Sequence, residues 1–298
     1  MRDADALLMN SSTDMGTTVS IEAGPDDAGW EFIGLRVQRI KAGGFVNYSA
    51  GSDEVCLVPL RGTATVESDG QSWTISRPGT VFDGKPTALY LPLGSTMTIT
   101  AGEQDAEIAI AGSHASQRFP ARLITPDEIE VEIRGAGNAA RQINHIIPPE
   151  FPAHRLLVVE VVTPSGNWSS FPPHKHDVSN LPEEADLEEI YYYRMHPSEG
   201  FGLQRLYSAD GSFDHAWVIR DGDLLLVPEG YHAFAVAHGY TAYYLNVLAG
   251  DEAIRTMQPS DDPAYAWVRE TWTGSRAEGL TSWREIDARV NAGAGRRR

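Results

Sequence analysis

Three histidines and one glutamate in the second half of the chain have types and spacing that suit metal binding. His174 and His176 flank Lys175, and Glu189 and His232 follow later in the sequence. On a β-strand, residues i and i+2 share a face, so the two imidazoles converge while Lys175 points away. Three neutral imidazoles and one carboxylate on converging strands suit a divalent cation of borderline hardness that keeps open coordination positions.

Each of these residues also has an ordinary structural interpretation. A lone His-x-His on a strand is often an exposed pair, and Glu189 lies close to Glu188 and Glu184, which is typical of a solvated acidic loop. His232 alone would fit a core histidine bonded to a carbonyl. The joint order favours the metal site: His-x-His, a glutamate that opens an aromatic strand, Gly-x5-Pro-x-Gly, and then a histidine.

The elements that must position these residues are short β-strands. Between residues 30 and 250, segments rich in Val, Ile, Leu, Tyr or Thr alternate with Gly, Pro, Asn and Asp. Long apolar helical periodicity is missing there, so we predict an all-β sandwich or barrel. The predicted strands are Glu54–Leu60, Thr63–Glu67, Ala88–Leu91, Ala106–Ala111, Leu156–Val162, Ile190–Tyr193, Leu224–Val227 and Tyr243–Leu248.

The chain contains what looks like two copies of one unit. An apolar strand runs into a Pro-x-Gly turn at residues 89–96 and again at residues 225–232, about 136 residues apart. That offset is the size of one β domain. We therefore predict an N-terminal barrel over residues 1–145, a C-terminal barrel over 146–275, and a tail over 276–298.

The first copy lacks histidines where ligands would stand. It offers Asn47, Ser49, Glu54 and Thr96 at the corresponding places. Without imidazoles, the N-terminal barrel is predicted to hold no transition metal and to serve packing or oligomerisation.

Four further segments predict connections and short helices rather than barrel strands. We expect Pro120–Asn144 to connect the barrels, and we expect short helices or loops over Asp251–Met257, Ala264–Thr271 and Ser282–Val290.

Composition excludes several functions. The net charge of −17 disfavours nucleic acid as a partner. The single cysteine, Cys56, allows neither an intrachain disulfide nor a cysteine-rich zinc site. No run approaches 18 apolar residues, and the N-terminus shows no signal peptide, so we expect a cytoplasmic protein without a membrane span.

The order of the motifs resembles the cupin superfamily, in which three histidines and one glutamate hold a mononuclear metal. Two spacings depart from it: twelve residues separate His176 from Glu189, and one residue separates Gly230 from His232. The first departure is explained by a loop insertion, and it leaves Glu188 as an alternative ligand. Strand alternation favours Glu189, which shares its face with Tyr191 and Tyr193.

Several longer segments resemble the 5-deoxy-glucuronate isomerase family of bacterial myo-inositol degradation, which is similar to the deoxy-ketouronate isomerases of pectin breakdown. The resemblance covers roughly residues 20–270 and is carried by residues 135–142, 167–177, 186–193, 200–205, 218–232 and 243–250. It implies two tandem cupin barrels (double-stranded β-helix, jelly-roll), of which only the C-terminal one binds metal.

The implied reaction is an aldose–ketose isomerisation that converts 5-deoxy-D-glucuronate to 5-dehydro-2-deoxy-D-gluconate. One divalent metal ion per chain, zinc or manganese, would be held by His174, His176, Glu189 and His232, because no redox change is required. Glu189 is then both a ligand and the candidate catalytic base, and because a ligating carboxylate is less basic, a second residue as the base is an open alternative. The alternatives are an iron(II) dioxygenase with the same ligand set and a non-catalytic cupin that binds sugar acids.

Four further residues are candidates for substrate binding. Strand alternation places Tyr191 and Tyr193 in the pocket, although both are equally compatible with a barrel core. Gln204 and Arg205 lie on alternate faces, so only one of them faces the metal. The carboxylate of a uronate favours the guanidinium fork of Arg205, while pairing of Arg205 with an acidic surface residue is an open alternative.

Partners are expected to be a small-molecule deoxy-uronate and further copies of the chain. The edges of large β-sheets in proteins with two cupin barrels are often covered by a partner subunit. We therefore expect a homo-oligomer, at least a dimer.

Overall fold

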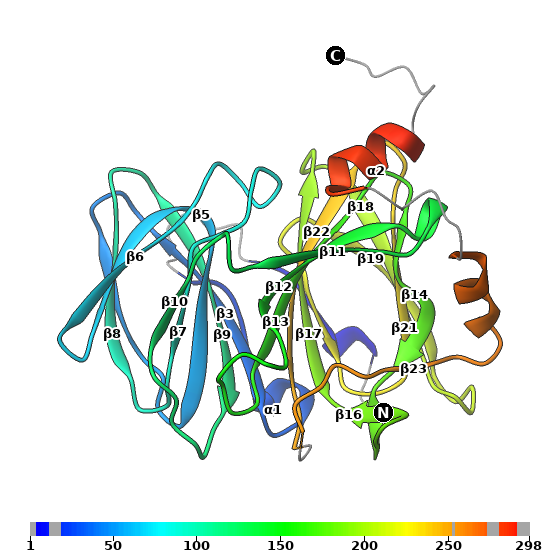
Figure 1. Ribbon diagram of the computed structural model, residues 1–298, viewed down its shortest axis with the longest axis horizontal. Coiled ribbons are helices and arrows are strands. Elements are labelled where there is room, and N and C mark those ends of the chain that lie inside the picture. Colours follow the sequence, from blue (N-terminus) through cyan, green and yellow to red (C-terminus); the bar gives the residue numbers. More distant parts are fainter. Residues whose placement is uncertain (1–3, 12–18, 252–253, 273–279, 291–298) are drawn as a thin grey trace.

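The computed structural model describes residues 4–11, 19–251, 254–272 and 280–290. Two β-barrels lie side by side, with the N-terminal barrel on the left of Figure 1 and the C-terminal barrel on the right. Short helical segments are η1 (Ala4–Ala6), α1 (Pro25–Ala28), η2 (Gly137–Ala139), η3 (Ala266–Trp272) and α2 (Trp283–Val290). Among the described residues, no helix is long and apolar enough to cross a membrane.

One sheet of nine strands curls into the N-terminal barrel. Its central path runs β10-β7-β5-β9-β3-β2, and β4, β6 and β8 complete it. The strands are β2 (Val19–Ala23), β3 (Ile33–Ile40), β4 (Phe45–Ser49), β5 (Asp53–Ser68), β6 (Gln71–Arg77), β7 (Ala88–Leu91), β8 (Thr96–Ala101), β9 (Ala106–His114) and β10 (Arg122–Ile124).

Strand β5 takes part in both sides of the N-terminal barrel. Its first half pairs with β7 and β9, and its second half pairs with β6 and β8. A register shift between Pro59 and Arg61 marks the change of side. The two strands expected over Glu54–Leu60 and Thr63–Glu67 are therefore one continuous strand.

Two facing sheets form the C-terminal barrel. The larger has the order β1-β20-β17-β22-β13-β12-β11, the smaller has the order β19-β18-β21-β14-β23, and β15 and β16 form a separate pair. The strands are β1 (Leu8–Met9), β11 (Glu130–Arg134), β12 (Arg141–Ile147), β13 (Leu157–Thr163), β14 (Trp168–Lys175), β15 (Asp177–Asn180), β16 (Glu184–Asp186), β17 (Glu188–His196), β18 (Phe201–Tyr207), β19 (Asp214–Arg220), β20 (Leu224–Val227), β21 (Tyr231–Val236), β22 (Thr241–Ala249) and β23 (Ser260–Asp261).

The C-terminal sheet begins earlier in the chain than residue 146. Strands β11 and β12 form a hairpin that pairs with β13, so much of the expected connection over Pro120–Asn144 belongs to this sheet. Strand β1 also joins it, through β20. The large sheet of the C-terminal barrel is thus completed at one edge by β1 and at the other edge by β11 and β12, all of which precede residue 148.

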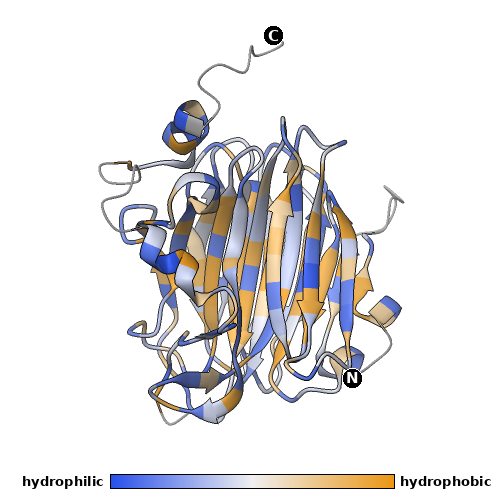
Figure 2. Cartoon of the chain, turned by 90° about the vertical axis from the view of Figure 1, so that its right-hand side faces the viewer, coloured by the Kyte–Doolittle hydropathy of each residue, from blue (hydrophilic) through white to orange (hydrophobic). Residues whose placement is uncertain are grey.

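Apolar side chains fill two regions. One cluster lies inside the N-terminal barrel and includes Val55, Leu57 and Ile110. A larger cluster contains residues of both barrels, such as Ile33 and Tyr243, so the two large sheets share one continuous core. Seen from the side, the strands alternate between hydrophobic and hydrophilic residues, as expected when one face of a sheet is buried (Figure 2).

Candidate metal and substrate site

Three side chains from three segments converge inside the C-terminal barrel. Glu189 is the second residue of β17, His232 is the second residue of β21, and His176 follows the end of β14. Glu189 Oε2 lies 3.0 Å from His176 Nε2 and 3.2 Å from His232 Nε2. The ligand atoms of all three lie within 4.8 Å of one another, so the group could hold a metal ion.

His174 lies beside this group. It pairs directly with His232 across β14 and β21, and the centroids of the two rings are 4.7 Å apart. Its ring centroid is 6.4 Å from that of His176. The four residues expected from the sequence are therefore neighbours, with His174 at the margin of the tighter group of three.

Backbone carbonyls orient the three imidazoles. The Nδ1 atoms of His174, His176 and His232 lie 3.2, 2.9 and 3.2 Å from the carbonyl oxygens of Pro172, Leu187 and Gly230, respectively. If each Nδ1 carries the proton, each Nε2 presents a lone pair, which is how metal-binding histidines are usually held.

The residues present fit a divalent cation. His232 is fully buried, and its Nε2 has no hydrogen-bond partner with suitable geometry among the described residues. A buried nitrogen without a partner is costly unless something binds it. Three imidazoles and one carboxylate form a donor set that suits zinc or manganese.

The electrostatics of the group suit the same role. Burial lowers the pKa of His174 well below its usual range, and His232 and His176 lower it further, so His174 is neutral at pH 7. Burial opposes ionisation of Glu189, but His232 and His176 outweigh burial and lower the pKa of this carboxyl. A neutral His174 and an ionised Glu189 are the states in which these two side chains bind a cation.

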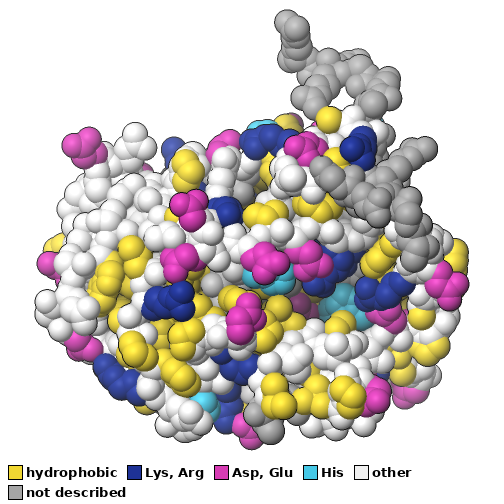
Figure 3. Space-filling view, in the orientation of Figure 1, with side chains coloured by type: hydrophobic (Ala, Val, Ile, Leu, Met, Phe, Trp, Pro, Cys, Tyr) yellow, Lys and Arg dark blue, Asp and Glu magenta, His cyan; other side chains and the backbone are white. Residues whose placement is uncertain are grey.

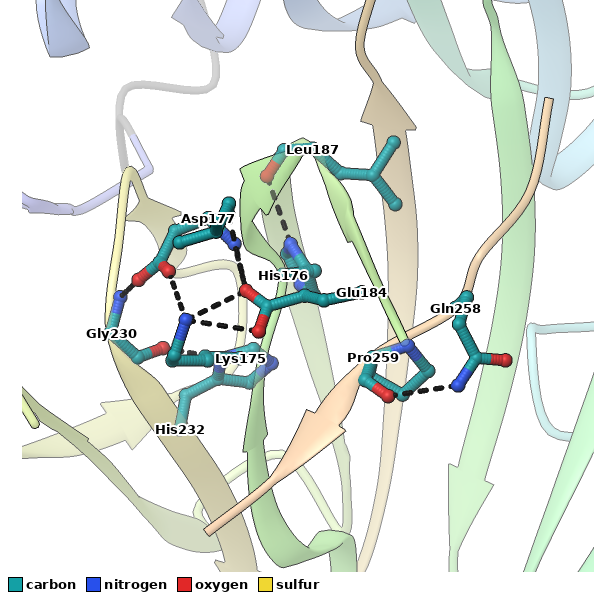
Figure 4. A network of polar contacts seen from close by, with 10 residues as sticks. Lys175, His176, Asp177, Glu184, Leu187, Gly230, His232, Gln258 and Pro259 are labelled. Atoms are coloured by element: carbon teal, nitrogen blue, oxygen red, sulfur yellow. Dashed lines mark hydrogen bonds and ion pairs between the residues drawn. The ribbon is translucent and has the colours of Figure 1, made fainter. Parts of the chain in front are cut away.

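A polar network fixes the loop that follows His176 (Figure 4). Lys175 Nζ donates to Asp177 Oδ1 at 2.5 Å and to Glu184 Oε1 at 2.7 Å. Asp177 Oδ2 in turn accepts from the backbone N–H of Gly230 at 2.7 Å, just before His232. Lys175 thus points away from the imidazoles, as strand alternation predicts, and helps to connect the two histidine segments.

A pocket opens onto the group. In Figure 3, histidine side chains are visible on the face of the C-terminal barrel, beside basic and acidic ones. The described residues that line the pocket come mainly from β11, β12, β13, β14, β17 and β22 and include His174, His176, Glu189, Tyr191, Ser170, Tyr244, Asn246, Arg134, Arg141 and His145.

Of the three interior residues expected to bind substrate, only Tyr191 lines this pocket. Its hydroxyl lies 3.1 Å from Ser170 Oγ. Tyr193 stacks behind it with a centroid distance of 5.8 Å, and the Tyr193 hydroxyl donates to Gln204 Oε1 at 3.0 Å. Tyr193 and Gln204 therefore form a buried layer behind Tyr191.

The structure corrects the interpretation of Arg205. Gln204 is fully buried, whereas Arg205 lies on the opposite face of β18 and forms two hydrogen bonds with Asp214, at 2.8 and 2.7 Å. The alternation of the strand places only Gln204 inside the barrel. The alternative of a surface ion pair is therefore the observed one for Arg205.

Three pocket residues on the β11–β12 hairpin were missed from the sequence: Arg134, Arg141 and His145. The glycines and polar residues of this hairpin are typical of a loop, so the sequence predicts a connection between the barrels there. Arg141, Ile143 and His145 alternate along β12, and that spacing was the available signal.

The arrangement of two barrels is shared with solved structures. Oxalate decarboxylase of Bacillus subtilis superimposes with a TM-score of 0.56 at 13% identity, covering 82% of this chain and 76% of that one. At this identity the likeness shows the fold alone. The protein therefore has an all-β, cupin-like fold with a buried histidine–glutamate group in one barrel.

Closer relatives define the family. The model of the KduI/IolB family matches residues 7–268. The 5-deoxy-glucuronate isomerase of Geobacillus kaustophilus is 42% identical over 264 residues, covering 88% of this chain and 94% of the relative. The enzyme of the same name from Bacillus subtilis strain 168 is 40% identical over 244 residues, covering 80% and 88%. The chain belongs to the KduI/IolB family.

A solved structure of a similar protein supports this family assignment. An IolB-like protein from Salmonella typhimurium superimposes with a TM-score of 0.84 at 36% identity, covering 88% of this chain and 99% of that one. With relatives of this kind over most of its length, the chain is an enzyme, an isomerase of the intramolecular oxidoreductase class.

Proposed function

We propose that the chain is a metal-dependent aldose–ketose isomerase that converts 5-deoxy-D-glucuronate to 5-dehydro-2-deoxy-D-gluconate. The observation that carries this proposal is the buried group of His176, Glu189 and His232 at a pocket, in a chain of the KduI/IolB family. The relatives at 36–42% identity that bear the name 5-deoxy-glucuronate isomerase support the choice of substrate.

His174, His176, Glu189 and His232 would hold one zinc or manganese ion. Such an ion supplies Lewis acidity, which polarises the substrate carbonyl and stabilises negative charge on the neighbouring oxygens. The carbonyl contacts of the three Nδ1 atoms keep the imidazoles in place.

The reaction needs a base that serves two adjacent carbons. A proton leaves the carbon that bears the hydroxyl group to give an enediolate, a proton is returned to the former aldehyde carbon, and the hydroxyl proton moves to the former carbonyl oxygen. We assign the transfer of the carbon-bound proton to Glu189, because its carboxylate lines the pocket next to His176. Positioned bases of this kind contribute typically ~10²–10⁴-fold to the rate.

Anaerobic turnover of 5-deoxy-D-glucuronate in deuterium oxide tests the proposal. The chain is assayed before and after chelation and after zinc or manganese is restored. We expect product with one solvent deuteron, lost on chelation and recovered with metal. Absence of product under every metal would contradict the proposal, and a strict requirement for oxygen would favour a dioxygenase.

The homo-oligomer expected from the sequence remains a prediction of the same proposal. Sedimentation velocity at micromolar protein should give a mass of at least twice 32.6 kDa. A monomer at all concentrations would contradict it.

A further inference from the structure

Two arginines line the pocket, and their surroundings differ. Arg134 donates to both carboxylate oxygens of Glu132, each at 2.7 Å, so its charge is neutralised. Arg141 is 3% exposed, and within the described part of the chain it forms no ion pair, its hydrogen-bond acceptors being backbone carbonyl oxygens. The pocket therefore contains a partly exposed guanidinium, Arg134, that is paired with a carboxylate, and a buried one, Arg141, that is not.

The hydrogen bonds that Arg141 donates to the described residues all come from Nη1, which leaves Nε and Nη2 of the guanidinium available to a ligand. Its Nη1 donates to the carbonyl oxygens of Ala139 at 3.0 Å and Phe171 at 3.4 Å. Its guanidinium lies 5.8 Å from the ring centroid of Trp272. Burial lowers its pKa to about 10, so the group keeps its charge at neutral pH. A buried charge without a counterion is costly, and an anion that enters the pocket would relieve that cost.

The hairpin loop is built closely around this side chain. Gly135 has a φ of +84°, and a Cβ there would lie 2.2 Å from Ala139 O and 2.9 Å from Arg141 Nη1. Asn167 Nδ2 donates to the carbonyl oxygen of Ala140 at 2.7 Å and thereby fastens the loop to the start of β14. Only glycine fits at residue 135, and the loop holds the guanidinium in a fixed place.

We propose that Arg141 anchors the carboxylate of an anionic sugar-acid substrate, with the carbon chain extending from Arg141 toward His174, His176 and Glu189. The inference rests on the proposed function, because it concerns the same pocket. A guanidinium fork matches a carboxylate with two parallel hydrogen bonds. In a chain with a net charge of −17, such a local cation is needed to attract an anion.

Measuring the affinity for an unreactive ligand tests carboxylate binding by Arg141 independently of catalysis. Calorimetry on the zinc-loaded chain compares D-gluconate, an unreactive sugar acid, with neutral D-glucitol. We expect the wild type to prefer gluconate by roughly 100-fold, and we expect Arg141→Gln to reduce this preference to within about threefold. The matched control is Arg205→Gln, which removes an arginine outside the pocket and should keep the full preference.

Kinetics give a second readout. With 5-deoxy-D-glucuronate, Arg141→Gln should raise KM by roughly 100-fold and change kcat by less than about tenfold, because the carboxylate contact is made before and during the reaction. Metal content measured on the same samples should equal that of the wild type.

The outcomes are distinguishable. Retention of the gluconate preference in Arg141→Gln would overturn the anchor even if the isomerase reaction stands. A wild type that prefers gluconate through Arg141 but converts no 5-deoxy-D-glucuronate would support the anchor and contradict the proposed reaction. If Arg141→Gln does not fold, Arg141→Lys decides: a roughly tenfold loss of gluconate affinity supports the two-bond contact, and unchanged affinity overturns it.

Discussion

The two barrels have corresponding strand pairings but differ in the side chains that occupy their interiors. Val55 on β5 pairs with Leu91, the last residue of β7, and Glu189 on β17 pairs with Val227, the last residue of β20. The register therefore places Val55 where the second barrel has Glu189. An aliphatic side chain stands at the position of the carboxylate.

The other candidate ligands have equally inert counterparts. Ser49 pairs with Thr96 across β4 and β8, as His174 pairs with His232 across β14 and β21. Among these described counterparts there is no imidazole and no carboxylate. The interior of the first barrel is an apolar cluster, and the same layers of the second barrel carry the polar group and its pocket.

The glutamates at the other face of each strand show what the two barrels have in common. Glu54 accepts the backbone N–H groups of residues 154–156 at 2.6–2.8 Å. Glu188 accepts those of residues 31–33 at 2.5–3.0 Å. Each barrel thus uses one carboxylate to bind three successive amides of the other. In β17 the inward-facing Glu189 therefore belongs to the site, whereas the outward-facing Glu188, like Glu54 of β5, joins the two barrels.

The largest expected effect is on activity, and it is specific to one barrel. Replacement of His232 by Ala should lower kcat/KM by at least about 10³-fold, because it removes a side chain from the proposed metal site. The matched change in the first barrel, Thr96→Ala, should leave kcat/KM within about twofold. Steady-state assays of both variants check this, and equal losses would remove the functional distinction between the barrels.

A carboxylate placed in the first barrel should be strongly destabilising. Val55→Glu would bury a charge among Leu57, Ile110 and their neighbours, at a cost of about 4 kcal/mol in the free energy of unfolding at neutral pH. Burial raises the pKa of such a carboxyl above its unfolded value. Stability relative to Val55→Gln should therefore fall as pH rises from about 4 to about 8.

Urea unfolding of both variants across that pH range is the measurement. A difference between Val55→Glu and Val55→Gln that does not depend on pH would show that the introduced carboxyl reaches water, and the apolar interior of the first barrel would be in doubt.

The carboxylates that join the barrels should matter for stability more than for catalysis. Glu54 is fully buried and Glu188 is partly exposed. Glu54→Gln should lower the free energy of unfolding by about 2 kcal/mol and Glu188→Gln by about 1 kcal/mol, since a neutral amide satisfies the three N–H groups less well. Denaturant titration measures both free energies of unfolding. A larger loss from Glu188→Gln than from Glu54→Gln would contradict the expectation that the more buried carboxylate contributes more to stability.

The smallest effect is expected at Arg205. Its pair with Asp214 is exposed, with 41% and 52% of the side-chain surfaces accessible. Exposed pairs contribute little, so Arg205→Gln should change the free energy of unfolding by less than about 1 kcal/mol and leave KM unchanged. A raised KM in this variant would indicate that Arg205 does contact the substrate and would contradict its assignment as a surface residue.

Much of the fold could be predicted from local patterns. Ala88–Leu91 and Leu224–Val227 are strands with the predicted bounds, and the helix expected over Ser282–Val290 is observed from Trp283. These segments are short and uniform in character, and turns bound the two strands, so propensity and periodicity suffice to locate them. The same alternation places Tyr191 and Tyr193 inside the barrel.

The pocket could not be completed in that way. Arg141 and His145 lie on β12, which is joined to the Glu189 strand β17 through the pairing of distant strands β13 and β22. The sequence repeat puts Glu54 at the place of Glu189, whereas the strand register puts Val55 there and matches Glu54 to Glu188. A shift of one residue reverses the face of a side chain, and only the assembled sheet fixes the register.

The most direct test of the account is the metal content per chain, measured by mass spectrometry of the purified protein and of the His174→Ala/His176→Ala double variant. We predict one zinc or manganese ion per wild-type chain and almost none in the double variant. Two ions per wild-type chain, or one ion retained in the double variant, would contradict the assignment of the chemistry to the C-terminal barrel.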